Sequence, residues 1–91
     1  MRINPDYMLK TIGDDHVVVP TGKEAIRFKG VITLNESGAR LFNALSKRSL
    51  EKKDLIQLLE EAYDVDTSTA SKDVERFLET LRAHNVLVED E

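Results

Sequence analysis

The chain has 91 residues, of which 41% are hydrophobic and 33% are charged, and its formal net charge is −4 at pH 7. It contains no cysteine, which excludes disulfides, zinc sites built from thiolates and cysteine nucleophiles. No apolar run approaches the roughly 20 residues that span a bilayer, so we expect residues 1–91 to form a single cytoplasmic domain with one core and no deep active-site cavity.

The first third of the sequence is typical of antiparallel strands. Residues 7–12 alternate loosely between apolar and polar side chains, residues 13–15 supply turn chemistry, and residues 16–20 are mostly β-branched. These runs predict a hairpin, and Pro20 either ends its second strand or marks that strand as an edge, because proline cannot donate to a strand ladder. A further run, 25–34, alternates in its first part and continues in extended form, and Gly30 within it predicts a bulge or a bend.

The remainder of the sequence predicts three amphipathic helices, at about 36–46, 50–63 and 68–84, followed by a short extended segment at 86–88. Each helix has polar residues suited to capping its start. The candidates are Asn35 or Ser37 for the first helix, Ser49 for the second, and Asp66 or Thr67 for the third. Asn85 is suited to a left-handed conformation that ends the third helix.

Three or four short strands followed by three helices predict an α+β fold. The expected architecture is winged helix-turn-helix-like, with a small three-stranded antiparallel sheet followed by three helices.

Residues that carry chemistry are sparse. His16 and His84 are the only histidines, and neither has a second metal ligand nearby in the sequence. The carboxylates fall on helix faces at spacings that suit solvation or helical ion pairs, and the four glycines form no phosphate-binding pattern. A chain this small has few residues that could surround and bury a carboxylate, and burial is what raises its pKa. We therefore expect no enzyme activity, no metal and no cofactor.

The helix arrangement also leaves a winged-helix DNA-binding transcription regulator as an alternative. The charge disfavours it, because residues 35–91 hold eight basic against thirteen acidic residues, a net charge of −5. A recognition helix at 67–84 would itself have no net charge among its Lys, Arg, Asp and Glu residues. Three basic residues could still serve as a wing, namely Lys23, Arg27 and Lys29.

A binding module is the remaining class of function. A sheet this small cannot close into a barrel, so it has edges, and an exposed edge is a template for a strand from another chain. A peptide beside residues 31–34 would gain main-chain hydrogen bonds from the strand and side-chain contacts from a neighbouring helix. The alternatives are that this edge is covered within the protein or pairs in a homodimer.

Two groups of residues, in order and at this spacing, resemble the pyrroloquinoline-quinone (PQQ) biosynthesis protein D (PqqD) family. The front half carries Tyr7, Val18-Val19-Pro20, Phe28-x-Gly30-x-Ile32-x-Leu34-Asn35-Glu36-x-Gly38-Ala39 and Leu45. The back half carries Leu59-Glu60-Glu61-x-Tyr63-Asp64-Val65-Asp66, Ala70-x-x-Asp73-Val74 and Phe77-Leu78-x-x-Leu81. Phe42 stands where many members carry tryptophan, and His84-Asn85 replaces a glycine-containing turn.

The resemblance implies a peptide-recognition domain for ribosomally made, post-translationally modified peptides. Such domains bind the leader segment of the precursor peptide as an added strand between the third strand and the third helix. They present it to a modifying enzyme, commonly a radical S-adenosylmethionine (radical SAM) maturase, and hold no cofactor themselves. A peptide along so short an edge buries little area, so we expect micromolar affinity.

A helical wheel of residues 68–84 places one border of the apolar stripe opposite the last strand. The candidate peptide-binding residues are Val31, Ile32, Thr33 and Leu34 on the strand, and Asp73, Phe77, Thr80 and His84 on the helix. For Phe77 the alternative is ordinary core packing, and for Asp73 it is a helix cap or a surface ion pair.

Overall fold

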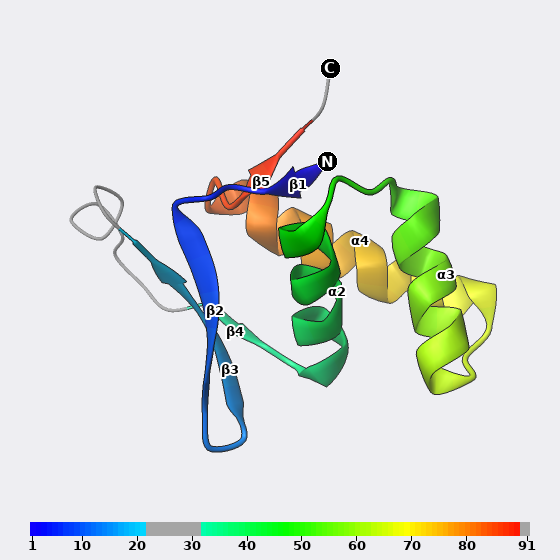
Figure 1. The fold of residues 1–91 in the computed structure, drawn as a ribbon. Coiled ribbons are helices and arrows are strands. Elements are labelled where there is room, and N and C mark those ends of the chain that lie inside the picture. The colour runs from blue at the N-terminus through cyan, green and yellow to red at the C-terminus, as the bar shows by residue number, and fades with distance from the viewer. Residues whose placement is uncertain (22–31, 90–91) are drawn as a thin grey trace.

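The computed structural model describes residues 1–21 and 32–89. Its strands are β1 (Arg2–Ile3), β2 (Tyr7–Ile12), β3 (Asp15–Pro20), β4 (Ile32–Leu34) and β5 (Leu87–Val88), and its helices are α2 (Glu36–Lys47), α3 (Lys52–Tyr63) and α4 (Thr67–Ala83) (Figure 1). The predicted first part of the third strand with its bend at Gly30, the candidate Val31, and the basic residues of the predicted wing lie outside the described residues.

The main sheet has the order β2-β3-β4, and both of its pairings are antiparallel. In the predicted hairpin Leu9 lies opposite Val18, and Gly13 makes the turn with a φ of 62°. Val17 lies opposite Thr33 in the second pairing, and β4 is the last strand of the sheet among the described residues. Within the described residues the sheet is followed by three helices, so the predicted α+β fold is confirmed.

A second, two-stranded sheet pairs β1 with β5 and was not predicted. It joins segments from opposite ends of the sequence (Figure 1). The amide of Asn4 extends the pairing by donating to the carbonyl of Val86 at 2.7 Å. The extended segment predicted at 86–88 is confirmed as β5, whereas β1 and its pairing with β5 have no alternation that a sequence pattern could detect.

The helix starts agree with the predictions at two of three positions. The Asn35 side chain accepts from the amide of Gly38 at 2.8 Å, and the Asp66 side chain accepts from the amide of Thr69 at 2.8 Å. The prediction that Ser49 caps the second helix is wrong, because α3 begins at Lys52 with Glu51 as its N-cap. The Ser49 hydroxyl instead donates to the carbonyl of Met1 at 3.1 Å.

The end of α4 confirms the prediction for Asn85, which has a φ of 59°. Its amide donates to the carbonyl of Arg82 at 3.2 Å, and the amide of Val86 donates to the carbonyl of Leu81 at 2.9 Å. These two bonds are those of a Schellman motif. They end the helix at a fixed place and turn the chain towards β5.

A single core joins the main sheet to the helices. Val18 on β3 is fully buried, Phe42 on α2 is 1% exposed, and Leu81 on α4 is fully buried. Phe42, which stands where many members of the family that the sequence resembles carry tryptophan, is thus an aromatic residue of the core. In Figure 1 the β2–β3 hairpin extends to one side of the helices, while β4 runs directly towards the start of α2. This arrangement places β4 where sheet and helices meet.

Candidate functional site

The junction between β4 and α2 has no loop residues beyond the cap itself. Leu34 ends the strand, Asn35 caps the helix, and Glu36 begins it. The third helical residue is Gly38, where an added Cβ would lie 3.1 Å from Asn35 Oδ1 and 3.2 Å from Leu34 Cβ. The glycine therefore lets the first turn of α2 lie against the end of β4.

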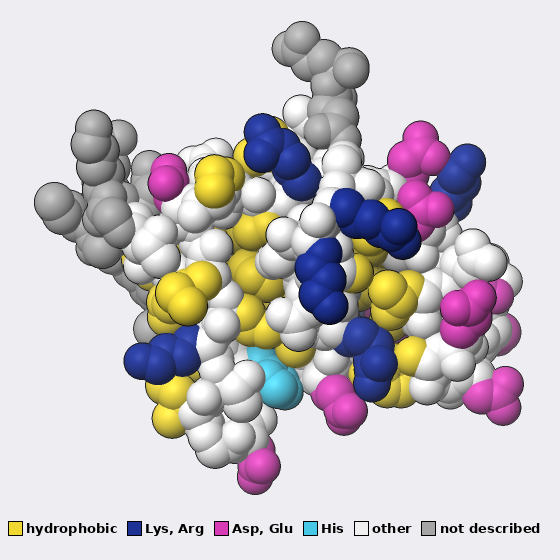
Figure 2. Space-filling view, in the orientation of Figure 1, with side chains coloured by type: hydrophobic (Ala, Val, Ile, Leu, Met, Phe, Trp, Pro, Cys, Tyr) yellow, Lys and Arg dark blue, Asp and Glu magenta, His cyan; other side chains and the backbone are white. Residues whose placement is uncertain are grey.

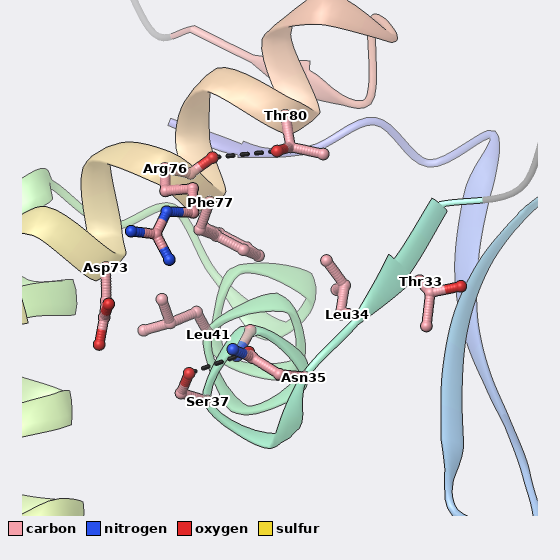
Figure 3. A pocket seen from close by; sticks show the side chains of 10 residues that line it. Thr33, Leu34, Asn35, Ser37, Leu41, Asp73, Arg76, Phe77 and Thr80 are labelled. Carbon is pink, nitrogen blue, oxygen red and sulfur yellow. Dashed lines mark hydrogen bonds between the residues drawn. The ribbon is translucent and has the colours of Figure 1, made fainter.

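Beside this junction lies a hollow of about 130 Å³, which we call the β4–α4 cleft. It is bounded by the end of β4, the first turns of α2 and one face of α4 (Figure 3). Its lining consists of Thr33, Leu34, Asn35, Ser37, Gly38, Leu41, Asp73, Arg76, Phe77 and Thr80.

The α4 wall of the cleft is built from residues spaced as one helix face. Asp73, Arg76, Phe77 and Thr80 are separated by the three- and four-residue steps that align side chains along a helix. Phe77 is only 6% exposed, so it belongs to the core and also forms part of the wall. The Thr80 hydroxyl donates to the carbonyl of Arg76 at 3.0 Å, so the two residues are joined across one turn of the helix.

The β4 side of the cleft presents a strand edge. Leu34 is 8% exposed and its side chain points towards Phe77, whereas the exposed side chain of Thr33 points away from the cleft (Figure 3). Thr33 therefore borders the cleft without directing its side chain into it. Across residues 1–21 and 32–89, β4 pairs only with β3, so its other edge has no strand partner there.

The cleft carries charge of both signs at its rim. Asp73 is half-buried and Arg76 is exposed. In the part of the chain that the structure describes, neither side chain forms an ion pair. The alternative that Asp73 caps the helix is wrong, because the N-cap of α4 is Asp66.

The structure separates two predicted residues from this cleft. Ile32 is 4% exposed and packs in the core, because it shares the inward face of β4 with Leu34. His84 is exposed at the C-cap of α4, where its Nδ1 lies 2.9 Å from the carbonyl of Thr80. Neither residue lines the cleft, and the remaining predicted residues within the described chain do.

Sequence reasoning missed Arg76 and the α2 floor of the cleft. Arg76 follows Asp73 by three residues and precedes Thr80 by four, so the same helical spacing could have identified it. Ser37 and Leu41 belong to the first turns of a helix that follows β4 without a loop. That missing loop was the signal that the helix start borders the strand edge.

Two acidic groups with shifted pKa values lie away from the cleft, on the helix surfaces. The backbone hydrogen bond from Thr69 lowers the pKa of Asp66, and the hydrogen bond from Lys52 at 2.7 Å lowers the pKa of Glu75. Both shifts favour a charged carboxylate on the surface, as in a helix cap and an ion pair. Among the described residues we find no group of three His, Asp or Glu residues that could hold a metal ion.

Charge is distributed unevenly over the visible face. In Figure 2 acidic side chains gather over the side that carries α3, while lysine and arginine side chains lie over the middle of the face. None of the described helices has the length and the apolar composition required to cross a bilayer.

Comparison with known proteins gives one family match and two similar structures. The family described as coenzyme PQQ synthesis protein D (PqqD) matches residues 15–87. The structure described as TbiB1 in complex with the TbiA(beta) leader peptide has a TM-score of 0.75 and 20% identity, over 100% of this chain and 99% of that chain. Lasso peptide synthetase B1 complexed with the leader peptide has a TM-score of 0.72 and 18% identity, over 97% of this chain and 96% of the other. No curated protein matches the sequence.

Proposed function

Because this chain belongs to the PqqD family, we propose that it binds the leader segment of a ribosomally made precursor peptide and presents it to a peptide-modifying enzyme. The observation that carries the proposal is the β4–α4 cleft, which lies beside a strand edge without a partner strand among the described residues. Two solved proteins of similar fold are complexes with leader peptides, which supports the same class of ligand here.

The leader peptide adds to the main sheet as a further strand along β4. Backbone amides and carbonyls of residues 31–34 then supply affinity that does not depend on the peptide's sequence, and the cleft supplies selectivity. A peptide side chain that enters the cleft meets the apolar side chains of Leu34, Leu41 and Phe77. Its neighbours meet Asp73 and Arg76 at the rim.

The candidate residues take different roles in this arrangement. Ile32 holds β4 in the sheet, because its side chain belongs to the core. Its backbone groups face Val18 of β3, since antiparallel pairing alternates along a strand and leaves the groups of Thr33 on the outer edge. Thr80 borders the cleft, and His84 lies one helical turn beyond it along α4. His84 would thus contact only a peptide that extends past the cleft in that direction.

The domain performs no chemistry in this proposal and carries no cofactor. Its second partner is the enzyme that modifies the peptide, of which a radical SAM maturase is the favoured class. We place the action of residues 1–91 in the cytoplasm as a single domain. Once the bound leader is identified, it names the precursor peptide and shows whether the product is pyrroloquinoline quinone.

Calorimetric titration with synthetic leader segments encoded beside this gene tests the proposal. We expect one of them to bind with a dissociation constant in the micromolar range, because the edge is short and the peptide must be ordered. A scrambled peptide of the same composition is the control. No heat with any such peptide, together with a mobility shift of duplex DNA, would favour the transcription-regulator alternative.

The homodimer alternative uses the same strand edge. If two copies pair through β4, the protein elutes as a dimer in size-exclusion chromatography, and the leader peptide converts it to a monomer. A dimer that persists at saturating peptide would place the dimer contact elsewhere on the surface.

A further inference from the structure

A second hollow, of about 320 Å³, lies next to the β4–α4 cleft. The two share Asn35, Ser37 and Asp73 in their linings, so they meet at the start of α2. The second hollow continues towards the end of α3, where Tyr63 and Val65 line it. We call it the Tyr63 hollow.

The floor of the Tyr63 hollow is apolar and held in place. Leu59 is 1% exposed, while Tyr63 and Val65 are half-buried and pack against the core. The Arg40 side chain fixes the aromatic ring, since its Nε donates to the Tyr63 hydroxyl at 3.2 Å and its guanidinium carbon lies 5.4 Å from the ring centroid. Because these side chains are already ordered, a ligand that binds there loses little free energy to ordering the protein.

We propose that the Tyr63 hollow takes a large apolar side chain of the leader peptide, outside the segment that pairs with β4. This inference rests on the proposed function. The occupant is the same peptide because the two hollows share three lining residues, so a chain that leaves the cleft past Asn35 enters the Tyr63 hollow. The volume of about 320 Å³ accommodates a leucine, methionine or phenylalanine side chain.

The topology also gives the order of the two contacts along the peptide. All described pairings of the main sheet are antiparallel, and a strand added to β4 in the same manner runs opposite to it. Asn35 follows the C-terminal end of β4. The peptide residue in the Tyr63 hollow therefore precedes the β4-paired segment in the peptide sequence.

Selection from a phage-displayed library of random dodecapeptides tests this inference on the full chain. We expect the selected peptides to share two apolar positions at a fixed spacing. Replacing the earlier of the two positions by alanine should weaken binding about tenfold, the loss expected for one well-buried apolar side chain. The protein variant Val65→Ala should reduce the effect of that peptide substitution, whereas Val19→Ala, a matched change on β3, should leave it unchanged.

A second measurement uses the wild-type chain, so it does not depend on the folding of any variant. A selected peptide with benzoylphenylalanine at the earlier apolar position is photo-crosslinked and the product is mapped by mass spectrometry. Crosslinks to Leu59, Tyr63 or Val65 support the inference. Crosslinks elsewhere overturn it.

The outcomes separate this inference from the proposed function. In one outcome the selected peptides bind and the Thr33→Pro protein binds them more weakly, but the peptides share only one apolar position and Val65→Ala does not change the effect of the peptide substitution. The Tyr63 hollow is then not used, and the proposed function stands. If no peptide is enriched, or if binding does not respond to Thr33→Pro, the mode of binding proposed for β4 is wrong and the inference falls with it.

Discussion

At the scale of single residues, the approach of β4 to α2 depends on the absence of a side chain at Gly38. Replacing glycine by alanine inside a helix usually raises the free energy of unfolding by up to about 1 kcal/mol. Here the new Cβ would lie 3.1 Å from Asn35 Oδ1 and 3.2 Å from Leu34 Cβ, which is closer than ordinary packing. We therefore predict that Gly38→Ala leaves the free energy of unfolding unchanged or lowers it, as measured by urea denaturation.

The control for this prediction is Asn43→Ala in the same helix. Asn43 is exposed, so its replacement should raise the free energy of unfolding by the few tenths of a kcal/mol expected from helix propensity, roughly 0.5 kcal/mol. A gain of about 1 kcal/mol for Gly38→Ala would show that β4 and α2 can move apart without cost.

Asp66 gives the stability of the protein a pH dependence with a definite sign. The hydrogen bonds from Thr69 lower the pKa of Asp66 in the folded protein, so its ionised form favours folding. This stabilisation is complete above the pKa of the unfolded chain and is lost as the pH falls through the lower, folded pKa. We predict that the wild type loses stability relative to Asp66→Asn as the pH falls below about 4, because asparagine caps the helix without titrating.

Urea denaturation of both proteins between pH 7 and pH 3 measures this difference. The ion pair of Lys52 with Glu75 is present in both proteins, so its own pH dependence, which has the same sign, cancels in the comparison. Parallel stability curves for the two proteins would show that the charge on Asp66 does not contribute.

At the scale of elements, the proposed function assigns affinity to the backbone of β4 and not to its outward side chains. The Thr33 side chain is exposed and points away from the cleft (Figure 3). We predict that Thr33→Ala changes the dissociation constant of the leader peptide by less than about twofold, while Thr33→Pro, which lacks the amide donor, raises it about tenfold or more. Calorimetric titration measures both values, and circular dichroism confirms that both variants fold.

Equal peptide affinities for the two folded Thr33 variants would contradict strand addition at this position. The paired design matters because both changes remove the same threonine side chain. Only the proline variant also removes a backbone donor, so the difference between them reports on the backbone.

The elements that the sequence predicts correctly are those with a repeating pattern. The helices α2 and α4 have apolar residues at helical spacing, and side chains at Asn35 and Asp66 mark where they begin. The pairing of β1 with β5 has no pattern, and the start of α3 depends on Glu51, whose amide donates to the Asp54 side chain at 2.9 Å. Long-range pairing and competing caps are decided by tertiary contacts that no local pattern contains.

The candidate site divides in the same way. The spacing of α4 places Asp73, Phe77 and Thr80 on one face, and the structure brings that face to the cleft. A helical wheel gives the direction of a residue around the helix axis but not how far the cleft extends along that axis. For this reason the wheel also assigns His84 to the peptide-binding face, although it does not line the cleft. Strand alternation could have assigned Ile32 to the core, because Leu34 shares its face.

At the scale of the whole molecule, the position of the cleft connects peptide binding to global stability. Leu34, Leu41 and Phe77 line the cleft and also belong to the single core cluster. A peptide seated there cannot remain bound when the core unfolds. For a domain that unfolds in one cooperative step, such a ligand raises the free energy of unfolding by an amount that grows with the logarithm of its free concentration divided by its dissociation constant.

We therefore predict that a leader peptide at a free concentration of 100 times its dissociation constant raises the free energy of unfolding by about 2.7 kcal/mol. Urea denaturation with and without peptide measures the change. Thr33→Pro at the same peptide concentration should gain less, because its dissociation constant is higher, and a scrambled peptide should produce no gain. A wild-type protein that binds the peptide without becoming more stable would show that the peptide binds the unfolded chain equally well. The folded cleft would then not be the site of recognition.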